Sequence, residues 1–220
     1  MPTRFTKRTG GVSHGAFASL NLGTHVGDEL SDVLDNRAIL ESEFGAIQFM
    51  NQVHGDRIAL IEEITDEIPT ADALVTGIPG ITVAVMVADC IPLLLTSAES
   101  VAAVHVGRRG LVNEITRKTI SVMRDMGATT IKAVVGPAIC GDCYEVSEEI
   151  FNEVVALHPA SESRTPSGTY ALNLPAALQS VLRDEGITIE DESHCTVENH
   201  DYFSYRRDGV TGRQVGLVWL

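Results

Sequence analysis

The stretch ITVAVMVADCIPLLLTSAESVAAVHV, residues 81–106, contains three apolar runs separated by short breaks. The runs at 81–87, 91–95 and 101–106 are rich in Val, Ile, Leu and Ala and show no alternation of polar and apolar residues. This pattern is typical of strands that are buried on both faces. A charged residue and a proline interrupt the stretch, and no run is long enough to span a bilayer. We therefore expect the centre of the chain to form strands of a covered β-sheet.

Helical patterns lie on both sides of these strands. Apolar residues recur at helical spacing in four segments, with Ser31 and Ser147 as expected N-caps and glycine at several C-termini. The expected helices span 31–45, 111–127, 146–157 and 175–185, and further strands are expected at 131–135 and 214–219. Strands that alternate with helices predict an α/β protein.

Composition limits the classes of function. The 220 residues include 30 acidic and 16 basic ones, which gives a formal net charge of −14. This balance disfavours a nucleic-acid partner or an anionic membrane, because both need clustered Lys and Arg. A small anion is still compatible, since a local arginine cluster outweighs a distant, screened field. The sequence predicts no particular oligomeric state.

The sequence predicts one domain whose cysteines are reduced thiols. The N-terminal sequence MPTRFTKRTGG lacks the apolar core of a signal peptide, and four cysteines in 220 residues do not suggest a disulfide scaffold. The polar segment 158–168 is expected to be a surface loop, not a domain boundary. We therefore expect one domain, residues 1–220, in a cytoplasmic protein.

Three candidate ligands are each expected at the end of an apolar strand, beside glycine, proline or a charged residue. His54 belongs to NQVHG, Cys90 to ADCIP and His105 to HVGRRG. Two imidazoles and one thiolate suit a zinc ion with one open position. The same residues also suit a cysteine nucleophile with a histidine base, or they are ordinary buried side chains in separate places. The spacing alone leaves these alternatives open.

A second cysteine motif is Cys140-Gly-Asp-Cys143. A CxxC pair is compatible with redox activity, or with half of a zinc site completed by His194 and Cys195. We expect instead a glycine-containing turn with two reduced thiols that are not needed for activity.

Arginines near glycine mark a candidate anion site. Arg206 and Arg207 occur in FSYRRDG, and Arg109 follows His105 by four residues. Guanidinium groups bind phosphate through paired donors, although a salt-bridged turn is an equally good interpretation of the arginine pair. Neither a Walker-type nor a dinucleotide-binding glycine motif is present.

Seven ordered segments now identify a resemblance to the YfiH-like family. They are SHGAFASLNLGTHVGD (13–28), NQVHGDRI (51–58), ADALVT (71–76), ADCIPLLL (88–95), HVGRRGL (105–111), VGPAICGDCYEV (135–146) and CTVENHDYFSYRRDGVTGRQVGLVWL (195–220). This family was described first as multicopper polyphenol oxidases or laccases and later as purine nucleoside phosphorylases. The resemblance implies a four-layer α/β/β/α sandwich with mixed sheets. It also implies that His54, Cys90 and His105 bind zinc, with copper as the alternative metal. The chain departs from the family at Arg108, where tryptophan is usual. This replacement changes the side chain that is available for stacking on a purine base.

The resemblance implies phosphorolysis of purine nucleosides such as adenosine, inosine and methylthioadenosine. Phosphate would convert them to the free base and the corresponding ribose 1-phosphate, with adenosine deamination as a side activity. We expect Arg109 and Arg206 or Arg207 to bind the phosphate. Two rival functions are a copper-dependent polyphenol oxidase and a hydrolase or editing factor of cell-wall precursor metabolism that uses Cys90 as nucleophile. The chain has only seven histidines and they are scattered, whereas the copper sites of an oxidase need more histidines in clustered motifs, which argues against the oxidase.

Overall fold

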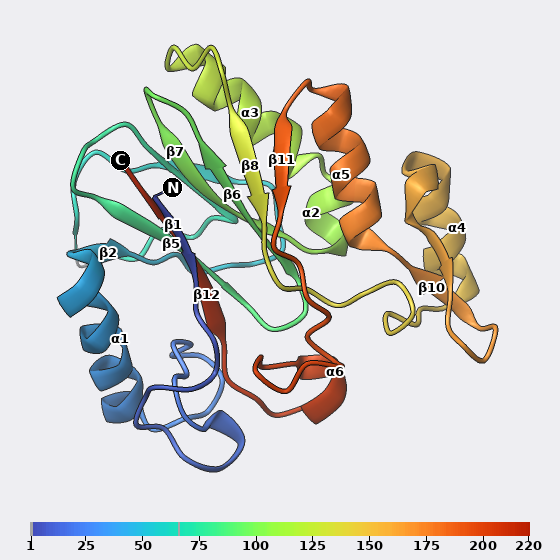
Figure 1. The fold of residues 1–220 in the computed structure, drawn as a ribbon, viewed down its shortest axis with the longest axis horizontal. Helices are drawn as coiled ribbons and strands as arrows, with labels where there is room; N and C mark the ends of the chain where they lie inside the picture. Colours follow the sequence, from blue (N-terminus) through green and yellow to red (C-terminus); the bar gives the residue numbers. More distant parts are fainter. Residues whose placement is uncertain (1, 66) are drawn as a thin grey trace.

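The computed structural model describes residues 2–65 and 67–220 and contains two main β-sheets (Figure 1). The larger sheet has six strands in the order β11-β8-β6-β7-β4-β3. These are β3 (Ile58–Leu60), β4 (Ala73–Thr76), β6 (Ile91–Thr96), β7 (Val101–Val106), β8 (Lys132–Val135) and β11 (Thr188–Asp191). It is a mixed sheet, because β6 pairs antiparallel with β7 and β8, whereas β3 pairs parallel with β4.

The smaller sheet has four strands in the order β1-β12-β5-β2. These are β1 (Thr3–Phe5), β2 (Ile47–Gln48), β5 (Thr82–Val87) and β12 (Gln214–Trp219). The two sheets pack face to face, and alternate residues of β5 point in opposite directions. Val83, Val85 and Val87 pack toward the larger sheet, whereas Ala84 and Met86 pack toward the opposite side. This two-sided packing explains why the strand is almost wholly apolar, as predicted.

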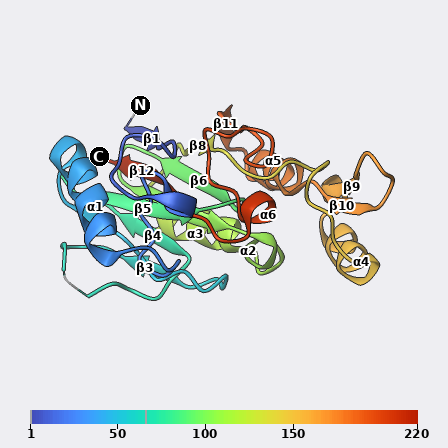
Figure 2. The same cartoon turned by 90° about the horizontal axis from the view of Figure 1, so that it is seen from below.

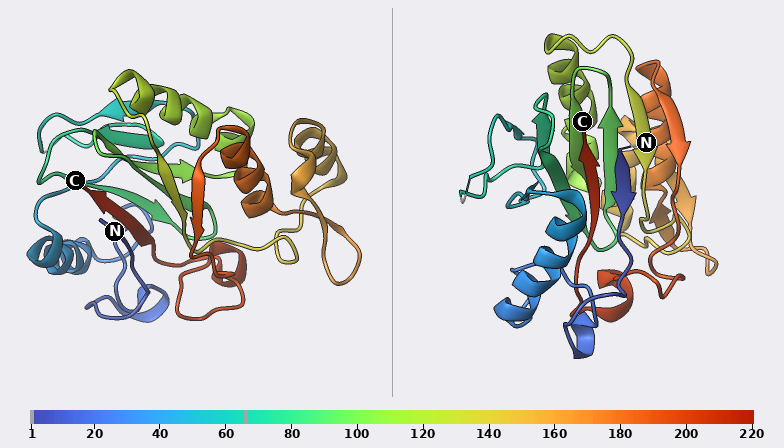
Figure 3. Two further views of the ribbon diagram at one scale, coloured as in Figure 1. Left: turned by 45° about the horizontal axis from the view of Figure 1, so that its top comes forward. Right: turned by 60° about the vertical axis from the view of Figure 1, so that its left-hand side comes forward.

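Helices cover the outer face of each sheet and complete four layers (Figures 2 and 3). Helix α1 (Leu30–Phe44) covers the four-stranded sheet through a cluster that includes Leu40. On the far side, α2 (Arg108–Val112), α3 (Ile115–Asp125) and α5 (Leu174–Asp184) pack on the six-stranded sheet. The predicted α/β sandwich with mixed sheets is therefore confirmed.

Two predictions of local structure were wrong. The helix expected over 111–127 is divided into α2 and α3, because Glu114 adopts a left-handed conformation with φ of 59°. Ser31 is not the N-cap of α1: the cap position is Glu29, and no side chain caps the helix. By contrast, the Ser147 hydroxyl accepts from the Ile150 amide and begins α4 (Glu148–Leu157) as expected.

A smaller unit extends from one end of the sandwich (Figure 2). It contains α4, the 3₁₀ turn Pro159–Ser161 and a hairpin of β9 (Glu162–Arg164) and β10 (Tyr170–Leu172). The segment expected to be only a surface loop therefore includes a short strand. The C-terminal part of the chain forms α6 (Tyr205–Asp208) before it enters β12. No helix within the described ranges combines the length and the apolar character needed to cross a membrane.

Candidate active site

The fold brings His54, Cys90 and His105 together from three separate elements. His54 lies in the loop between β2 and β3, Cys90 ends the turn between β5 and β6, and His105 is the penultimate residue of β7. The antiparallel register pairs Pro92 with His105, so Cys90 lies beside the end of β7. One ligand atom from each of the three residues lies within 4.8 Å of the other two. A single ion can therefore contact all three.

Unusual backbone conformations aim these side chains at one point. His54 has a φ of 58° and Asp89, just before Cys90, has a φ of 92°, both in the region that non-glycine residues rarely adopt. Gly107 leaves room for the cluster, because a Cβ at this position would lie 3.0 Å from the Cys90 sulfur and 3.3 Å from the His54 ring. The glycine is therefore required by close approach.

A buried carboxylate, Asp72, supports the cluster from behind. Its Oδ1 lies 2.8 Å from Nδ1 of His105 and accepts from the His54 amide at 2.9 Å, while its Oδ2 accepts from the Gly55 amide at 2.7 Å. A carboxylate can only accept, so Nδ1 of His105 must carry a proton, and Nε2 is the ring nitrogen that faces the site. Asp72 thus fixes both histidines, one through its ring and one through its backbone.

The protonation states in the metal-free site are linked. Burial opposes ionisation of Cys90, but the charge of His105 and hydrogen bonds from His105 and His54 outweigh it, and the pKa of the thiol falls to about 6. Burial likewise opposes the charge of His105, but Cys90 and Asp72 raise its pKa to about 9. The pair is therefore a thiolate and an imidazolium at neutral pH. A preformed thiolate is the form that binds a metal or attacks an electrophile.

These donors fit the metal that the family resemblance implies. The thiolate and the Nε2 atom of His105 face the same point, and Nε2 of His54 lies 3.9 Å from the Cys90 sulfur. A histidine ligand whose other ring nitrogen donates to a carboxylate is the usual support of a protein-bound zinc. Three protein ligands leave one coordination position free for a small molecule.

A pocket of about 430 Å³ opens directly over this cluster. It combines the three candidate ligands with aromatic, apolar and cationic side chains from both sheets and from the C-terminal segment. The lining residues are His25, Gln52, His54, Met86, Val87, Ala88, Asp89, Cys90, His105, Ile139, Tyr144, Tyr205, Arg206 and Arg213. The volume is sufficient for a small organic ligand of the size of a nucleoside.

Only one of the three predicted arginines lines the pocket. Arg206 does, held by its amide on the Asp89 carboxylate at 2.7 Å and by a guanidinium bond to the Glu145 carbonyl at 3.0 Å. Arg109 is an exposed residue of α2 outside the lining. Arg213, which was not among the candidates, enters the pocket in its place.

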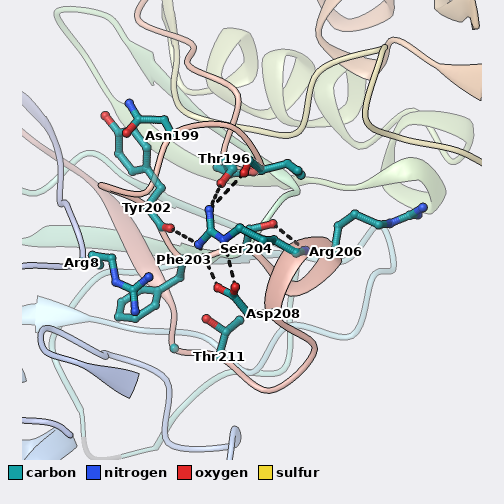
Figure 4. Close-up of polar contacts among 12 residues, drawn as sticks. Arg8, Thr196, Asn199, Tyr202, Phe203, Ser204, Arg206, Asp208 and Thr211 are labelled. Atoms are coloured by element: carbon teal, nitrogen blue, oxygen red, sulfur yellow. Dashed lines mark hydrogen bonds and ion pairs between the residues drawn. The ribbon is translucent and has the colours of Figure 1, made fainter. Parts of the chain in front are cut away.

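The Arg207 guanidinium is fully engaged within the protein (Figure 4). It donates to the carbonyls of Thr196 and Tyr202 at 2.7 and 2.9 Å and to both carboxylate oxygens of Asp208 at 2.9 and 2.8 Å. Figure 4 shows the side chain of Arg206 extending away from this group. We therefore revise the expectation for Arg207: it anchors the loop from which Arg206 projects, which corresponds to the structural alternative considered for this pair.

Sequence reasoning missed Asp72, Tyr144, His25 and Arg213. All four lie in segments that support the family resemblance, and their positions in those segments were the available signal. Burial and then the charge of Cys90 raise the pKa of the Tyr144 hydroxyl, while Arg108 acts against this. Burial and the charge of Arg213 lower the pKa of His25, which is therefore neutral at neutral pH.

Comparisons with known proteins agree over the whole chain. The model of the protein family described as multi-copper polyphenol oxidoreductase laccase matches residues 2–220. A Corynebacterium glutamicum protein named purine nucleoside phosphorylase is 43% identical over 98% of this chain and 93% of its own length. A Streptomyces coelicolor protein of the same name is 41% identical over 98% and 94%. The crystal structure of a Neisseria meningitidis DUF152 protein has a TM-score of 0.91 and 38% identity, covering 99% and 93% of the two chains. That of the hypothetical protein YfiH from Bacillus licheniformis has a TM-score of 0.89 and 30% identity, covering 99% and 92%.

Proposed function

The chain belongs to the multi-copper polyphenol oxidoreductase laccase family, which includes the YfiH and DUF152 proteins, and we propose that it is a purine nucleoside phosphorylase. The observation that carries this proposal is a pocket of nucleoside size that is lined both by a two-histidine, one-cysteine cluster and by Arg206 and Arg213. The relatives that carry the phosphorylase name cover nearly the whole chain, which adds independent support. Adenosine, inosine and methylthioadenosine are the proposed substrates, with adenosine deamination as a side reaction.

Zinc is the metal that we propose for His54, Cys90 and His105. When bound, it would supply a Lewis acid at the base of the pocket. The chain itself supplies the thiolate of Cys90 and the Nε2 atoms of both histidines. Metal binding would release the Nε2 proton of His105, and Asp72 keeps the remaining proton on Nδ1, as ligation through Nε2 requires. A thiol hydrolase needs only one imidazole beside its cysteine, so the second histidine at ligand distance favours the metal site over that rival. The same donor set also accepts copper, which metal analysis distinguishes.

Phosphate would enter beside Arg206 and Arg213. The protein as a whole is acidic, with a net charge of −14, so an anion must be attracted by local cations. Arg206 is anchored by its backbone, and Arg213 by guanidinium bonds to the carbonyls of Thr211 and Gly212 at 3.1 and 2.9 Å. Both arginines are therefore held in place before the phosphate arrives, which lowers the cost of ordering them.

In the reaction, a phosphate oxygen attacks the anomeric carbon of the sugar, and the bond to the purine nitrogen breaks. The bonding electrons stay on the purine, which must gain a proton. We assign this proton to the Tyr144 hydroxyl, because the phenol lies in the pocket and its raised pKa keeps it protonated at neutral pH. Phe and Ala substitutions of Tyr144 test this role, since Phe retains the ring and removes only the donor.

The deciding experiment incubates zinc-loaded protein with adenosine, with and without phosphate, and separates the products by chromatography. Phosphate-dependent release of adenine and ribose 1-phosphate is the expected result. Inosine formed without phosphate would reveal the deaminase activity alone, and no turnover by folded, zinc-loaded protein would refute the proposal. Arg206→Ala should raise the phosphate KM at least about tenfold, or about 1.4 kcal/mol. Arg109→Ala is the matched control, because this arginine is exposed outside the pocket.

A further inference from the structure

Three cysteines and one glutamate form a second cluster that the proposed reaction does not use. Cys140 and Cys143 lie in the loop between β8 and α4, and Cys195 and Glu198 lie in the segment between β11 and α6. One ligand atom from each residue lies within 4.8 Å of the others. In sequence, the cluster is a C-x₂-C pair combined with a C-x₂-E pair about fifty residues later. Paired ligands at this spacing are typical of structural zinc sites.

We propose that this cluster is a second, structural metal site that binds a zinc-type divalent cation through three thiolates and one carboxylate. Around a tetrahedral zinc with Zn–S bonds of about 2.3 Å, neighbouring sulfurs are about 3.8 Å apart. The sulfur of Cys143 already lies 3.9 Å from a carboxylate oxygen of Glu198. The remaining separations of up to 4.8 Å need movements of only about 1 Å, which small side-chain rotations provide.

The backbone of both loops presents the four donors to one point. The amides of Cys143 and Tyr144 donate to the Cys140 carbonyl at 3.2 and 3.1 Å, which closes a tight turn around the first pair. The Asn199 amide donates to the Cys195 carbonyl at 2.9 Å, so the second pair projects from one side of a single turn. A short parallel bridge between Ala138 and Cys195 joins the two loops. The donors are therefore arranged by main-chain contacts, not by chance proximity of mobile side chains.

The composition of the cluster favours a metal over a redox-active disulfide. A disulfide needs two sulfurs, whereas this cluster gathers a third thiol and a carboxylate that such chemistry does not require. Among residues 2–65 and 67–220, no Lys or Arg forms an ion pair with Glu198. A divalent cation would supply the positive charge that these donors lack. All four cysteines are free thiols in the structure.

The second site would hold one wall of the pocket in place. Tyr144 directly follows Cys143 and lines the pocket. Thr196 directly follows Cys195, and its hydroxyl donates to the Asp89 carboxylate at 2.6 Å. That carboxylate accepts from the amide of Arg206 through its other oxygen. Joining the two loops therefore fixes the positions from which Tyr144 and Arg206 enter the pocket.

Metal content of the full-length protein, purified under reducing conditions and loaded with zinc, tests the proposal independently of any nucleoside activity. We expect about two zinc ions per chain in the native protein and about one in a His54→Ala/Cys90→Ala variant. Adding Cys143→Ser or Glu198→Ala to that variant should remove or weaken the remaining ion. His194→Ala is the matched control, because this histidine neighbours Cys195 but is not a member of the cluster, and it should leave the metal content unchanged.

Two further measurements keep the test decisive. Cobalt bound to the His54→Ala/Cys90→Ala variant should show strong thiolate-to-metal charge-transfer absorption, which Cys143→Ser should reduce. If the combined variants do not fold, Cys143→Ser alone decides, because the zinc content should fall from about two to about one per chain. The proposal is overturned if the folded His54→Ala/Cys90→Ala variant binds no zinc. It is equally overturned if Cys143→Ser keeps the full metal content. It is also overturned if protein that is unfolded without reductant shows only two of its four thiols, because the other two cysteines would then form a disulfide.

Discussion

Replacing Asp72 by asparagine should impair metal binding without touching a ligand. The carboxylate of Asp72 is fully buried and accepts from Nδ1 of His105 and from the amides of Val53, His54 and Gly55. An asparagine of the same shape has one acceptor oxygen and one donor group. Whichever way the amide is turned, one contact is lost or reversed: either its NH₂ group faces backbone amides, or His105 must accept at Nδ1 and carry its proton on Nε2.

The size of the effect follows from these contacts. A lost partner of a ligating histidine typically lowers metal affinity about 10–100-fold, or about 1.4–2.7 kcal/mol. Leaving buried polar groups unsatisfied costs about 1–3 kcal/mol of the free energy of unfolding in addition. We therefore expect Asp72→Asn to bind zinc more weakly by about one to two orders of magnitude and to unfold at lower temperature.

Competition with a chromophoric chelator measures the zinc affinity, and circular dichroism measures the thermal midpoint. Asp56→Asn is the matched control, since Asp56 is an exposed aspartate near the same loop that pairs with Lys118. It should leave both quantities nearly unchanged. An unaltered zinc affinity in folded Asp72→Asn protein would refute the argument that this carboxylate sets the His105 tautomer.

Three other predictions concern charges whose surroundings are defined by the structure. In metal-free protein, Cys90 should react with iodoacetamide as a thiolate above a midpoint of about pH 6, and His105→Asn should raise this midpoint toward the ordinary thiol range. Glu185→Gln should lower the free energy of unfolding by about 1 kcal/mol at neutral pH, because the partly exposed guanidinium groups of Arg124 and Arg117 stabilise the carboxylate. The carboxyl pKa is lowered in the folded protein, so in urea titrations this difference should be lost as the pH falls through the range of that lowered pKa, and its persistence in acid would contradict the ion-pair explanation. Arg207→Ala should destabilise the fold by about 2–4 kcal/mol, because several carbonyls and a carboxylate lose their donor, and a change confined to the phosphate KM would show that this arginine binds substrate after all.

The strands were predictable from sequence because their environment is uniform. The run at 101–106 was predicted with its observed bounds, since both faces of β7 are covered and every position except His105 is apolar. The break between α2 and α3 was not, because Glu114 is an ordinary helix former and its residue type does not indicate the left-handed conformation that it adopts. The N-terminus of α1 also escaped prediction, since no capping hydrogen bond marks it.

The candidate metal ligands could be proposed from sequence because each carries a distinctive side chain near an expected apolar strand, although His54 lies in a loop and not at the end of a strand. Asp72 could not be distinguished from other aspartates, as its role depends on three amides and a ring that are distant in sequence or lie in another loop. Glu198 was missed for the same reason, and His194, the residue considered as a fourth ligand, lies instead beside the Tyr202 ring. Local sequence patterns therefore identify side chains that can ligate a metal, whereas the residues that contact those side chains depend on the tertiary fold.

The two adjacent arginines of the FSYRRDG motif occupy different surroundings, because Arg207 is bonded within the protein and Arg206 lines the pocket. Arg206 and Arg207 have the same side chain and neighbouring positions in a helix of four residues, yet they point to different surroundings. Successive residues of a helix lie about 100° apart around its axis, so one helical turn cannot direct both guanidinium groups to the same place. Arg207 is surrounded by carbonyl oxygens that satisfy it, whereas the Arg206 guanidinium has one such bond and faces the pocket. The arginine that we propose for phosphate binding, Arg206, therefore depends on Arg207 to hold the loop. A substitution at either position should weaken phosphate binding by a different route: Arg206→Ala at unchanged stability, and Arg207→Ala together with a loss of stability.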